Sequence, residues 1–239
     1  INSSVMRKAL LSRVLLGISS GLFAQKGSVE AYSRENLLSK LESSIVYSLP
    51  EFVEGHVYYK DASMVVSTLN VCAFDNSVRF ISGKDTLKLR SIDNVDCILT
   101  SENKFVRRDG MVLNLLRESD FCSLGERKRL KLSEPKKDGG YGAVPASSSA
   151  RVASNDDHSS TDSHSYGYPV SVDYLVSFDY YLVMPDGSVV QAKKAAFVAA
   201  FPLIKDKINS IIKLKKLKLA KKEDVLYLYD YCLHELNQH

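Results

Sequence analysis

The chain has 239 residues, of which 45% are hydrophobic and 25% charged, the composition of a globular protein with a sizeable core. Its 32 basic and 28 acidic residues give a net charge of +4, but Arg7, Lys8 and Arg13 lie in an N-terminal segment without acids. The remainder therefore carries 4 − 3 = +1. Such a chain has little long-range field to attract polyanions, and we expect no nucleic acid partner.

The N-terminal segment has the pattern of an export signal. Arg7 and Lys8 precede an apolar run over residues 14–23, and Ala24 offers a small residue for cleavage. We expect residues 1–24 to be a signal peptide with an upstream remnant before Met6. Arg13 interrupts the pattern, so a buried N-terminal helix of a cytosolic protein is the alternative. The run is shorter than the roughly 20 residues that span a bilayer, and we expect no transmembrane anchor after cleavage.

The ending Gly21-Leu22-Phe23-Ala24-Gln25-Lys26 resembles the signal-peptide ends of exported proteins of Bacteroidota. A β-rich body followed by a Lys-rich helical tail after Phe201-Pro202 is similar to uncharacterised secreted proteins of those bacteria. The resemblance implies an exported protein, either periplasmic or associated with the outer membrane or extracellular. It implies no known activity.

Residues 52–132 are expected to form an antiparallel β-meander. Apolar segments alternate with turn formers about every ten residues, and no helical segment separates them. Asp109-Gly110 suits a type I′ turn, in which both central residues have positive φ. The expected strands are 57–59, 64–71, 78–81, 86–89, 95–100, 105–108, 111–115 and 127–132.

The segments on either side of this body are less regular. Leu37, Leu41 and Ile45 have helical spacing, with Ser33 or Asn36 as the cap, so residues 27–50 are expected to be a short helix or an irregular arm. Residues 133–168 are rich in Ser, Gly and Pro and contain few large apolar groups. They cannot offset the entropy of ordering, and we expect a long flexible loop.

The C-terminal part is expected to be a β-hairpin followed by two amphipathic helices. Apolar and polar residues alternate over residues 170–184, as in a strand. The triplet 185–187 has the composition of a turn, and residues 188–192 are expected to form the second strand of the hairpin. Phe197, Phe201, Ile204, Ile208 and Ile211 form one helical stripe, in which Pro202 marks a kink or a new helix. A second helix begins near residue 223, with an apolar face made of Val225, Leu226, Tyr229, Cys232, Leu233 and Leu236.

The expected fold class is therefore α+β, with four segments. They are residues 1–24, the signal peptide; 25–132, the N-terminal arm and β body; 133–168, the flexible loop; and 169–239, the hairpin and helical tail packing on the same body. Cys72, Cys97, Cys122 and Cys232 permit two disulfides in an exported chain, but buried core thiols are slightly favoured.

Candidate catalytic and metal-binding residues are few. His158 and His164 lie among Asp156, Asp157 and Asp162, but a flexible segment seldom fixes metal ligands, and we expect neither metal nor cofactor. His56 has no recognisable triad partners, so catalytic residues stay unknown. Asp61, Asp75 and Asp93 fall in turns, where a carboxylate bonds nearby backbone.

Two surface features suggest binding instead. The eight lysines of residues 205–222 are interpreted as a solvated helix face, with an anion-binding strip as the alternative. Adjacent tyrosines on a strand point to opposite faces, so half must be exposed or at an interface. The candidates are Tyr58, Tyr59, Tyr166, Tyr168, Tyr180 and Tyr181.

The sequence thus favours a non-enzymatic exported module that binds a protein or a cell-envelope component. A small exported hydrolase with an unidentified active site is the alternative. A pocket gathering His56 with acids would favour the hydrolase, whereas an exposed apolar or tyrosine patch would favour binding.

Overall fold

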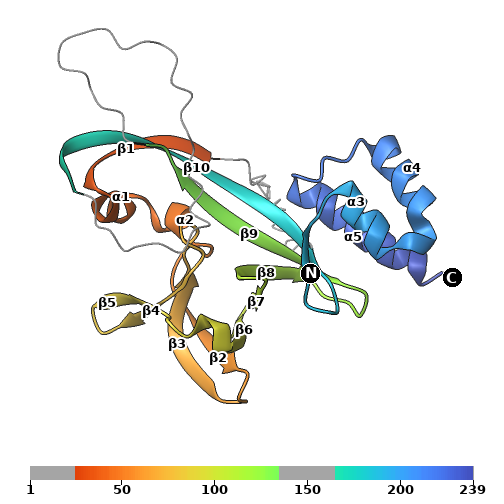
Figure 1. Cartoon of the computed structure of the whole chain (residues 1–239), viewed down its shortest axis with the longest axis horizontal. Helices are drawn as coiled ribbons and strands as arrows, with labels where there is room; N and C mark the ends of the chain where they lie inside the picture. The colour runs from red at the N-terminus through yellow and green to blue at the C-terminus, as the bar shows by residue number, and fades with distance from the viewer. Residues whose placement is uncertain (1–24, 135–164, 239) are drawn as a thin grey trace, which may run out of the picture.

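The computed structural model describes residues 25–134 and 165–238 as an α+β structure built on one antiparallel sheet (Figure 1). The predicted signal segment 1–24 and residues 135–164 of the predicted loop lie outside the described residues. The strands are β1 (Gln25–Ser33), β2 (Val53–Tyr59), β3 (Met64–Val71), β4 (Val78–Ser82), β5 (Asp85–Lys88), β6 (Val95–Thr100), β7 (Lys104–Arg108), β8 (Met111–Arg117), β9 (Ser123–Leu132), β10 (Ser165–Val183) and β11 (Val189–Gln191).

The helices lie near the two ends of the described chain, before β2 and after β11. They are α1 (Arg34–Lys40), α2 (Ser43–Val46), α3 (Lys194–Ala200), α4 (Lys205–Lys215) and α5 (Lys222–Leu236), with 3-10 turns η1 (Ile92–Asn94) and η2 (Pro202–Ile204). Pro202 starts η2, where its missing N–H costs little, so it opens a new helical segment and does not kink one.

The antiparallel prediction is confirmed, since every strand pair of the described residues is antiparallel. The sheet order is β1-β10-β9-β8-β7-β6-β2-β3-β4-β5, and β11 pairs with β10. The sheet therefore contains two meanders, one made of β2 to β5 and the other of β6 to β10. They are joined by the pairing of β6 with β2, whereas a single meander would pair β6 with β5.

The 19-residue strand β10 organises the molecule. Its residues 174–183 pair with β9 along one edge, and β1 and β11 share the other edge. The predicted stripe of alternating residues from Tyr174 to Leu182 does share one face. The first half of this face packs against Leu37, Ile45 and Val46 of α1 and α2, and its second half packs against α3, α4 and α5.

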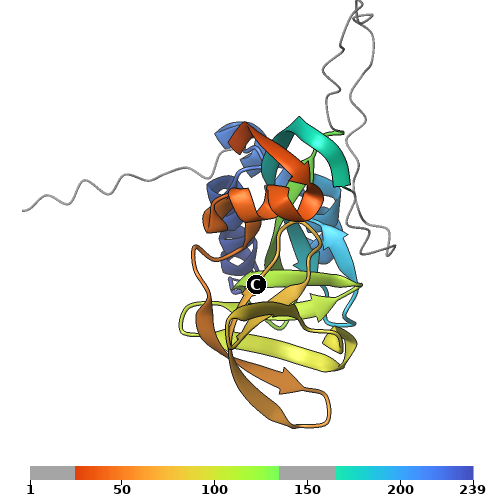
Figure 2. The ribbon, with the colours of Figure 1, turned by 90° about the vertical axis from the view of Figure 1, so that its left-hand side faces the viewer.

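The strands β2 to β8 curl around a core of their own (Figure 2). Asn76, in the turn after β3, donates its side-chain amide to the Val112 carbonyl of β8 and accepts from the Val112 amide, at 3.1 and 2.8 Å. Three strands separate β3 from β8 in the sheet order, so the sheet must bend until they meet. This closure buries Val57, Leu69, Ile98 and Phe105, among others, on its inner side.

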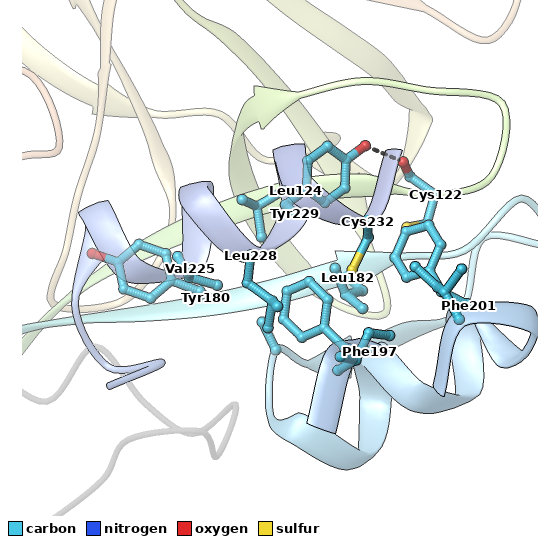
Figure 3. Packing of buried hydrophobic residues seen from close by; sticks show 13 residues of the cluster. Cys122, Leu124, Tyr180, Leu182, Phe197, Phe201, Val225, Leu228, Tyr229 and Cys232 are labelled. Carbon is cyan, nitrogen blue, oxygen red and sulfur yellow. Dashed lines mark hydrogen bonds between the residues drawn. The ribbon is translucent and has the colours of Figure 1, made fainter. Parts of the chain in front are cut away.

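The helical layer α3 to α5 packs on β9 and β10 at one end of the molecule (Figure 1). The predicted stripe is confirmed, because Phe197, Phe201, Ile204 and Ile208 are buried; Leu228, absent from the predicted face of α5, is buried as well. Figure 3 shows the Tyr229 hydroxyl pointing at the Cys122 carbonyl, to which it donates at 2.5 Å. Burial raises the pKa of Tyr229 to about 12, so this hydroxyl stays a donor.

The N-terminal arm departs from the prediction. Residues 25–33, expected to be irregular or helical, form β1 and pair with β10. The helix α1 follows, with Ser33 as its N-cap; the Ser33 side chain accepts from the Asn36 amide, which settles the choice of cap. The strand was missed because most of its residues are polar and Ala31 is the only one of them that is buried, so the sequence shows no apolar pattern of a strand. Likewise, residues 165–168 of the predicted loop belong to β10.

Three hairpin turns share an Asp-x-Ser sequence with the same hydrogen bonds. In each, the Asp carboxylate accepts from the Ser amide and the Ser hydroxyl, two residues on. The middle residue has positive φ in every case: Ala62 at 66°, Asn76 at 52° and Gly187 at 85°. The predicted Asp109-Gly110 turn also has positive φ at both residues.

This shared geometry predicts opposite effects of two substitutions. Ala62→Gly should raise the free energy of unfolding by about 0.5 to 1 kcal/mol, because an L-residue is strained in the left-handed region. Gly187→Ala should lower it by about 1 kcal/mol for the same reason. The nearest heavy atom to a Cβ at position 187 would be Cδ of Arg108 at 4.0 Å, so the added methyl group would not clash. The loss of stability would therefore report backbone strain alone. Urea unfolding measures both, and equal signs would contradict the shared turn.

The Tyr229 contact predicts a second effect on stability. Tyr229→Phe should lower the free energy of unfolding by about 1 kcal/mol, because the buried Cys122 carbonyl loses one of its two donors and keeps only the Ser119 hydroxyl. Tyr227→Phe is the matched control, since Tyr227 is exposed, and should change it by less than about 0.5 kcal/mol. Equal losses in both variants would show that the hydroxyl of Tyr229 contributes nothing specific.

Candidate functional site

The histidines suggested by the sequence do not assemble a catalytic site. His56 lies on β2 and stacks on Tyr58, with 6.4 Å between ring centroids, and its cross-strand neighbours are Val66 and Leu99. His158 and His164, with their neighbouring acids, lie outside the described residues. Within residues 25–134 and 165–238, no three His, Cys, Asp or Glu side chains gather in a way that could hold a metal ion.

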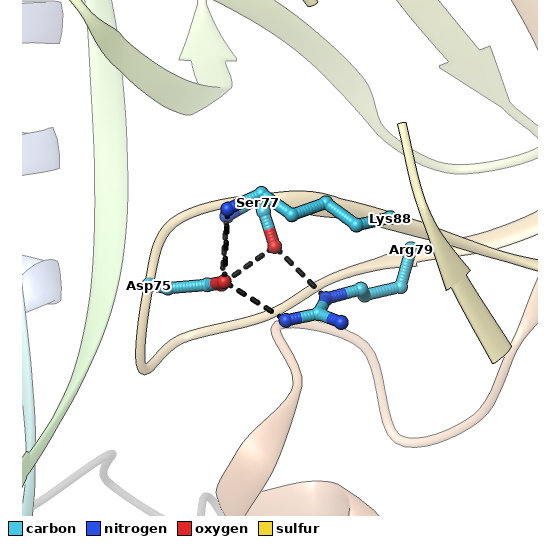
Figure 4. Close-up of polar contacts among 4 residues, drawn as sticks. All are labelled: Asp75, Ser77, Arg79 and Lys88. Carbon is cyan, nitrogen blue, oxygen red and sulfur yellow. Dashed lines mark hydrogen bonds and ion pairs between the residues drawn. The ribbon is translucent and has the colours of Figure 1, made fainter. Parts of the chain in front are cut away.

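The turn acids have structural partners. Asp61 accepts from Ser63, and Asp93 forms an ion pair with Arg107 at 2.7 Å. Asp75 accepts from Ser77 and lies 2.8 Å from the Arg79 guanidinium and 3.3 Å from Lys88 Nζ (Figure 4).

Burial by itself would raise the pKa of Asp75, but the hydrogen bond from Ser77 and the charges of Arg79 and Lys88 outweigh it and lower that pKa. The carboxylate is therefore ionised and fully engaged in holding the turn, which leaves it unsuited to act as a general acid or base.

Three exposed hydrophobic residues, Tyr58, Met64 and Val66, lie on the outer face of the curled sheet. Register places Met64, Tyr58, Cys97, Val106 and Leu113 opposite one another across β3, β2, β6, β7 and β8. Met64 is 47% exposed, whereas Leu113 is completely buried. This outer row therefore runs from solvent into the interior.

A second row lies beside the first on the same face. It consists of Val66, His56, Leu99, Lys104, Leu115, Gly125 and Tyr181. Gly125 provides room for Leu113, since a Cβ at 125 would lie 3.2 Å from Cβ of Leu113. The two rows share one face, on which most side chains are apolar and His56 and Lys104 are the polar ones.

Two cavities open on this face and meet at Asp96 and Cys97. The larger, about 560 Å³, lies over the β2–β3 hairpin and β6, and the smaller, about 370 Å³, lies towards β7, β8 and the turn after β10. The larger is lined by Tyr58, Tyr59, Lys60, Ala62, Asp96, Cys97 and Leu99. An apolar floor with a few charges at the rim is typical of a binding groove.

Two of the polar groups of the smaller cavity have structural partners. Lys104 binds Glu118 at 2.5 Å, and the Ser119 hydroxyl is engaged by Tyr229 and by the backbone of Cys122. None of the lining residues is a histidine. The hydroxyl and thiol groups of this cavity therefore have no imidazole beside them to act as a general base.

Cys97 is the one thiol of the four that is not fully buried, and all four cysteines are free. Burial and the negative charge of Asp96 raise the pKa of Cys97. Burial likewise raises the pKa of Cys72 to about 11, of Cys122 to about 11 and of Cys232 to about 12. A protonated thiol is a poor nucleophile, so Cys97 is suited to packing against a ligand and not to attacking one.

The tyrosines divide differently from the prediction. Tyr58 is exposed and Tyr59 half-buried, in line with opposite faces. Tyr180 is buried under α5 and Tyr181 is half-buried on the other face, because β10 is covered on both sides. Tyr166 and Tyr168 lie on β10.

The lysines of residues 205–222 are exposed except for Lys222, which is half-buried. Leu214, which lies between these lysines, is 77% exposed as well. No helix among residues 25–134 and 165–238 combines the length and the hydrophobicity needed to cross a membrane.

Comparison with known protein families, curated proteins and solved structures gave no match to this chain. The geometry of the outer face is therefore the basis for any functional conclusion.

The raised pKa of Cys97 predicts slow alkylation of the folded protein. At pH 8, iodoacetamide should modify Cys97 alone, and more slowly than it modifies free cysteine, because only the thiolate reacts. Asp96→Asn should speed the reaction, since removing the negative charge lowers the pKa of the thiol. Mass spectrometry of timed samples gives both rates.

The opposite result is equally informative. Labelling of Cys97 faster than free cysteine would reveal an activated thiolate, and would favour an enzyme over a binding module.

Proposed function

We propose that this protein is a non-enzymatic binding module that holds an extended apolar polypeptide segment along the open edge of β3. The proposal includes the sequence-based prediction of export to the cell envelope, which rests on residues outside the described part of the chain. The observation that carries it is the exposure of Met64, Val65 and Val66, three consecutive apolar residues on one strand.

The first part of β3 has a strand partner on one side only. Its pairing with β2 covers residues 64–69, but its pairing with β4 covers only residues 69–71. The Tyr59 amide donates to the Ser63 carbonyl, so the N–H and C=O groups of Ser63 face β2. Backbone direction alternates along a strand, so those of Val65 and Ser67 also face β2. The N–H and C=O groups of Met64 and Val66 therefore point away from β2, where an added strand would pair with them.

The side chains near this edge suit an apolar segment. Met64 and Val66 continue across the sheet into Tyr58, His56 and the larger cavity. A strand added beside β3 would place alternate side chains on this face, where the outer row offers apolar contact. Main-chain hydrogen bonds to β3 would supply affinity, and side-chain contacts in the larger cavity would supply selectivity.

The hydrolase alternative has less support. His56 lines neither cavity and its cross-strand neighbours are Val66 and Leu99, and the pKa of the Cys97 thiol is raised. An exposed apolar and tyrosine surface without converging polar groups fits binding better than bond cleavage.

A proline substitution tests this proposal. Val66→Pro removes a backbone N–H that points away from β2, so the fold should survive, as proline does on edge strands. We expect it to abolish binding of fluorescein-labelled heptapeptides rich in Val, Ile and Tyr. Val66→Thr keeps the backbone donor and should weaken binding less than about tenfold. Peptides N-methylated at alternate amides should not bind the unchanged protein.

Fluorescence anisotropy gives the affinities, and thermal unfolding verifies that both variants are folded. Failure of the whole peptide panel to bind at about millimolar concentration would refute the proposal. So would equal binding by the unchanged protein and Val66→Pro. Sedimentation provides a further check, because a dimer that Val66→Pro converts to monomer would mean that a second copy, not another polypeptide, occupies the edge.

A further inference from the structure

The helical layer presents a second unusual surface, distant from β3. Leu203 and Leu214 are 82% and 77% exposed, more than any other large hydrophobic residue of the described chain. The surrounding exposed lysines are Lys205, Lys213, Lys215 and Lys216. We call these six residues the lysine–leucine surface.

The fold holds both leucines outward. The turn η2 leads directly into α4, so Leu203 lies just before the first turn of α4 and Leu214 lies in its last turn; both side chains are exposed. Ile204 and Ile208, in the same stretch of chain, are buried in the core and hold this stretch against the sheet.

The positive charge of this surface is not neutralised locally. Residues 205–222 contain eight lysines and one acid, Asp206. Lys207 pairs with Glu235 at 2.6 Å and Lys222 with Glu126 at 3.2 Å. Within the described residues, the four lysines of the lysine–leucine surface form no ion pair. Outside residues 1–24 the chain carries a net charge of only +1, so this is a local concentration of charge.

We propose that the lysine–leucine surface docks the protein on a membrane carrying anionic lipid head groups. Lysines attract the anionic surface, and each one close to it contributes about fivefold in partitioning. Exposed leucines among them can enter the boundary between head groups and acyl chains. Exposed leucines and exposed lysines both occur along η2 and α4, and an interfacial anchor needs both kinds of side chain.

Neither helix capping nor nucleic acid binding accounts for the whole surface. Lysines in the last turn of α4 favour its negative C-terminal end, which explains Lys213 and Lys215 but not the exposure of Leu203 and Leu214. Nucleic acid would attract the lysines, yet residues 203–218 contain no Arg for base edges and no aromatic residue for stacking.

The surface and the β3 edge can be occupied together. In Figure 1 the helical layer lies at one end of the long axis of the molecule, and the β2–β3 and β4–β5 hairpins lie towards the other end. A protein docked through α4 would hold the β3 edge away from the bilayer. The membrane proposal does not depend on peptide binding, and either can fail alone.

Vesicle co-sedimentation of the full chain tests the proposal. We expect binding to vesicles with about 30% phosphatidylglycerol in phosphatidylcholine, weakening as salt rises, and little binding to phosphatidylcholine alone. Replacing Lys213, Lys215 and Lys216 by Gln should weaken binding about a hundredfold. Leu203→Ser with Leu214→Ser should weaken it about tenfold while leaving the charge unchanged.

The matched control replaces Lys26, Lys40 and Lys84 by Gln, three exposed lysines outside the helical layer, with the same change in net charge. It should bind as the unchanged protein does. The N-terminal apolar run is present in every variant, so its contribution cancels in the comparison.

Three results would overturn the proposal. One is the absence of binding to anionic vesicles, and another is an equal loss in the control and in the lysine variant. The third is binding of a single-stranded oligonucleotide that is stronger than vesicle binding and unaffected by the leucine changes, which would make nucleic acid the partner.

Discussion

The burial of one face of β10 along its length, and of its other face at Tyr181 and Val183, is the constraint on which the rest of the structure depends. A strand of 19 residues can be covered along its length only if several elements share the task. One face takes α1 and α2 over its first half and α3 to α5 over its second, while Tyr181 and Val183 on the other face pack with Val106 and Leu113 of the curled sheet. Because apolar burial is the main favourable term in folding, these contacts make the helices, β9 and the curled sheet one cooperative unit.

This arrangement protects some sheet edges and leaves one open. The edge strand β1 carries polar residues such as Lys26, Ser28 and Glu30, and β5 has only four residues, both common means of preventing unwanted strand pairing. The first half of β3 has neither protection, since Met64, Val65 and Val66 are apolar and lie beyond the reach of β4. An unprotected apolar edge is a liability in a protein without a partner for it, which is why we attach function to this strand.

Charge and hydrophobicity are also distributed unevenly between the two ends of the molecule. The sheet end presents an apolar groove with paired charges, as Lys104 and Glu118 illustrate, whereas the helical end presents a concentration of lysines around Leu203 and Leu214. A near-neutral total charge conceals this difference, because long-range attraction depends on the sum but contact at a surface depends on the local arrangement. Two separate partners, a polypeptide and a lipid surface, are consistent with one folded unit.

The sequence by itself determined the antiparallel class, most strand positions, the apolar stripe from Phe197 to Ile208 and the turns at Asp109-Gly110 and Asp186, because period and turn chemistry are local properties. The Asp-x-Ser repeat of the turns is local in the same sense. Only the tertiary structure decided that residues 25–33 are a strand, since their partner, β10, lies about 140 positions away. The pairing of β2 with β6, the closure of Asn76 on Val112 and the exposure of Met64 and Leu214 were decided in the same way. Burial depends on which segments meet, and alternation within one segment cannot specify its neighbours.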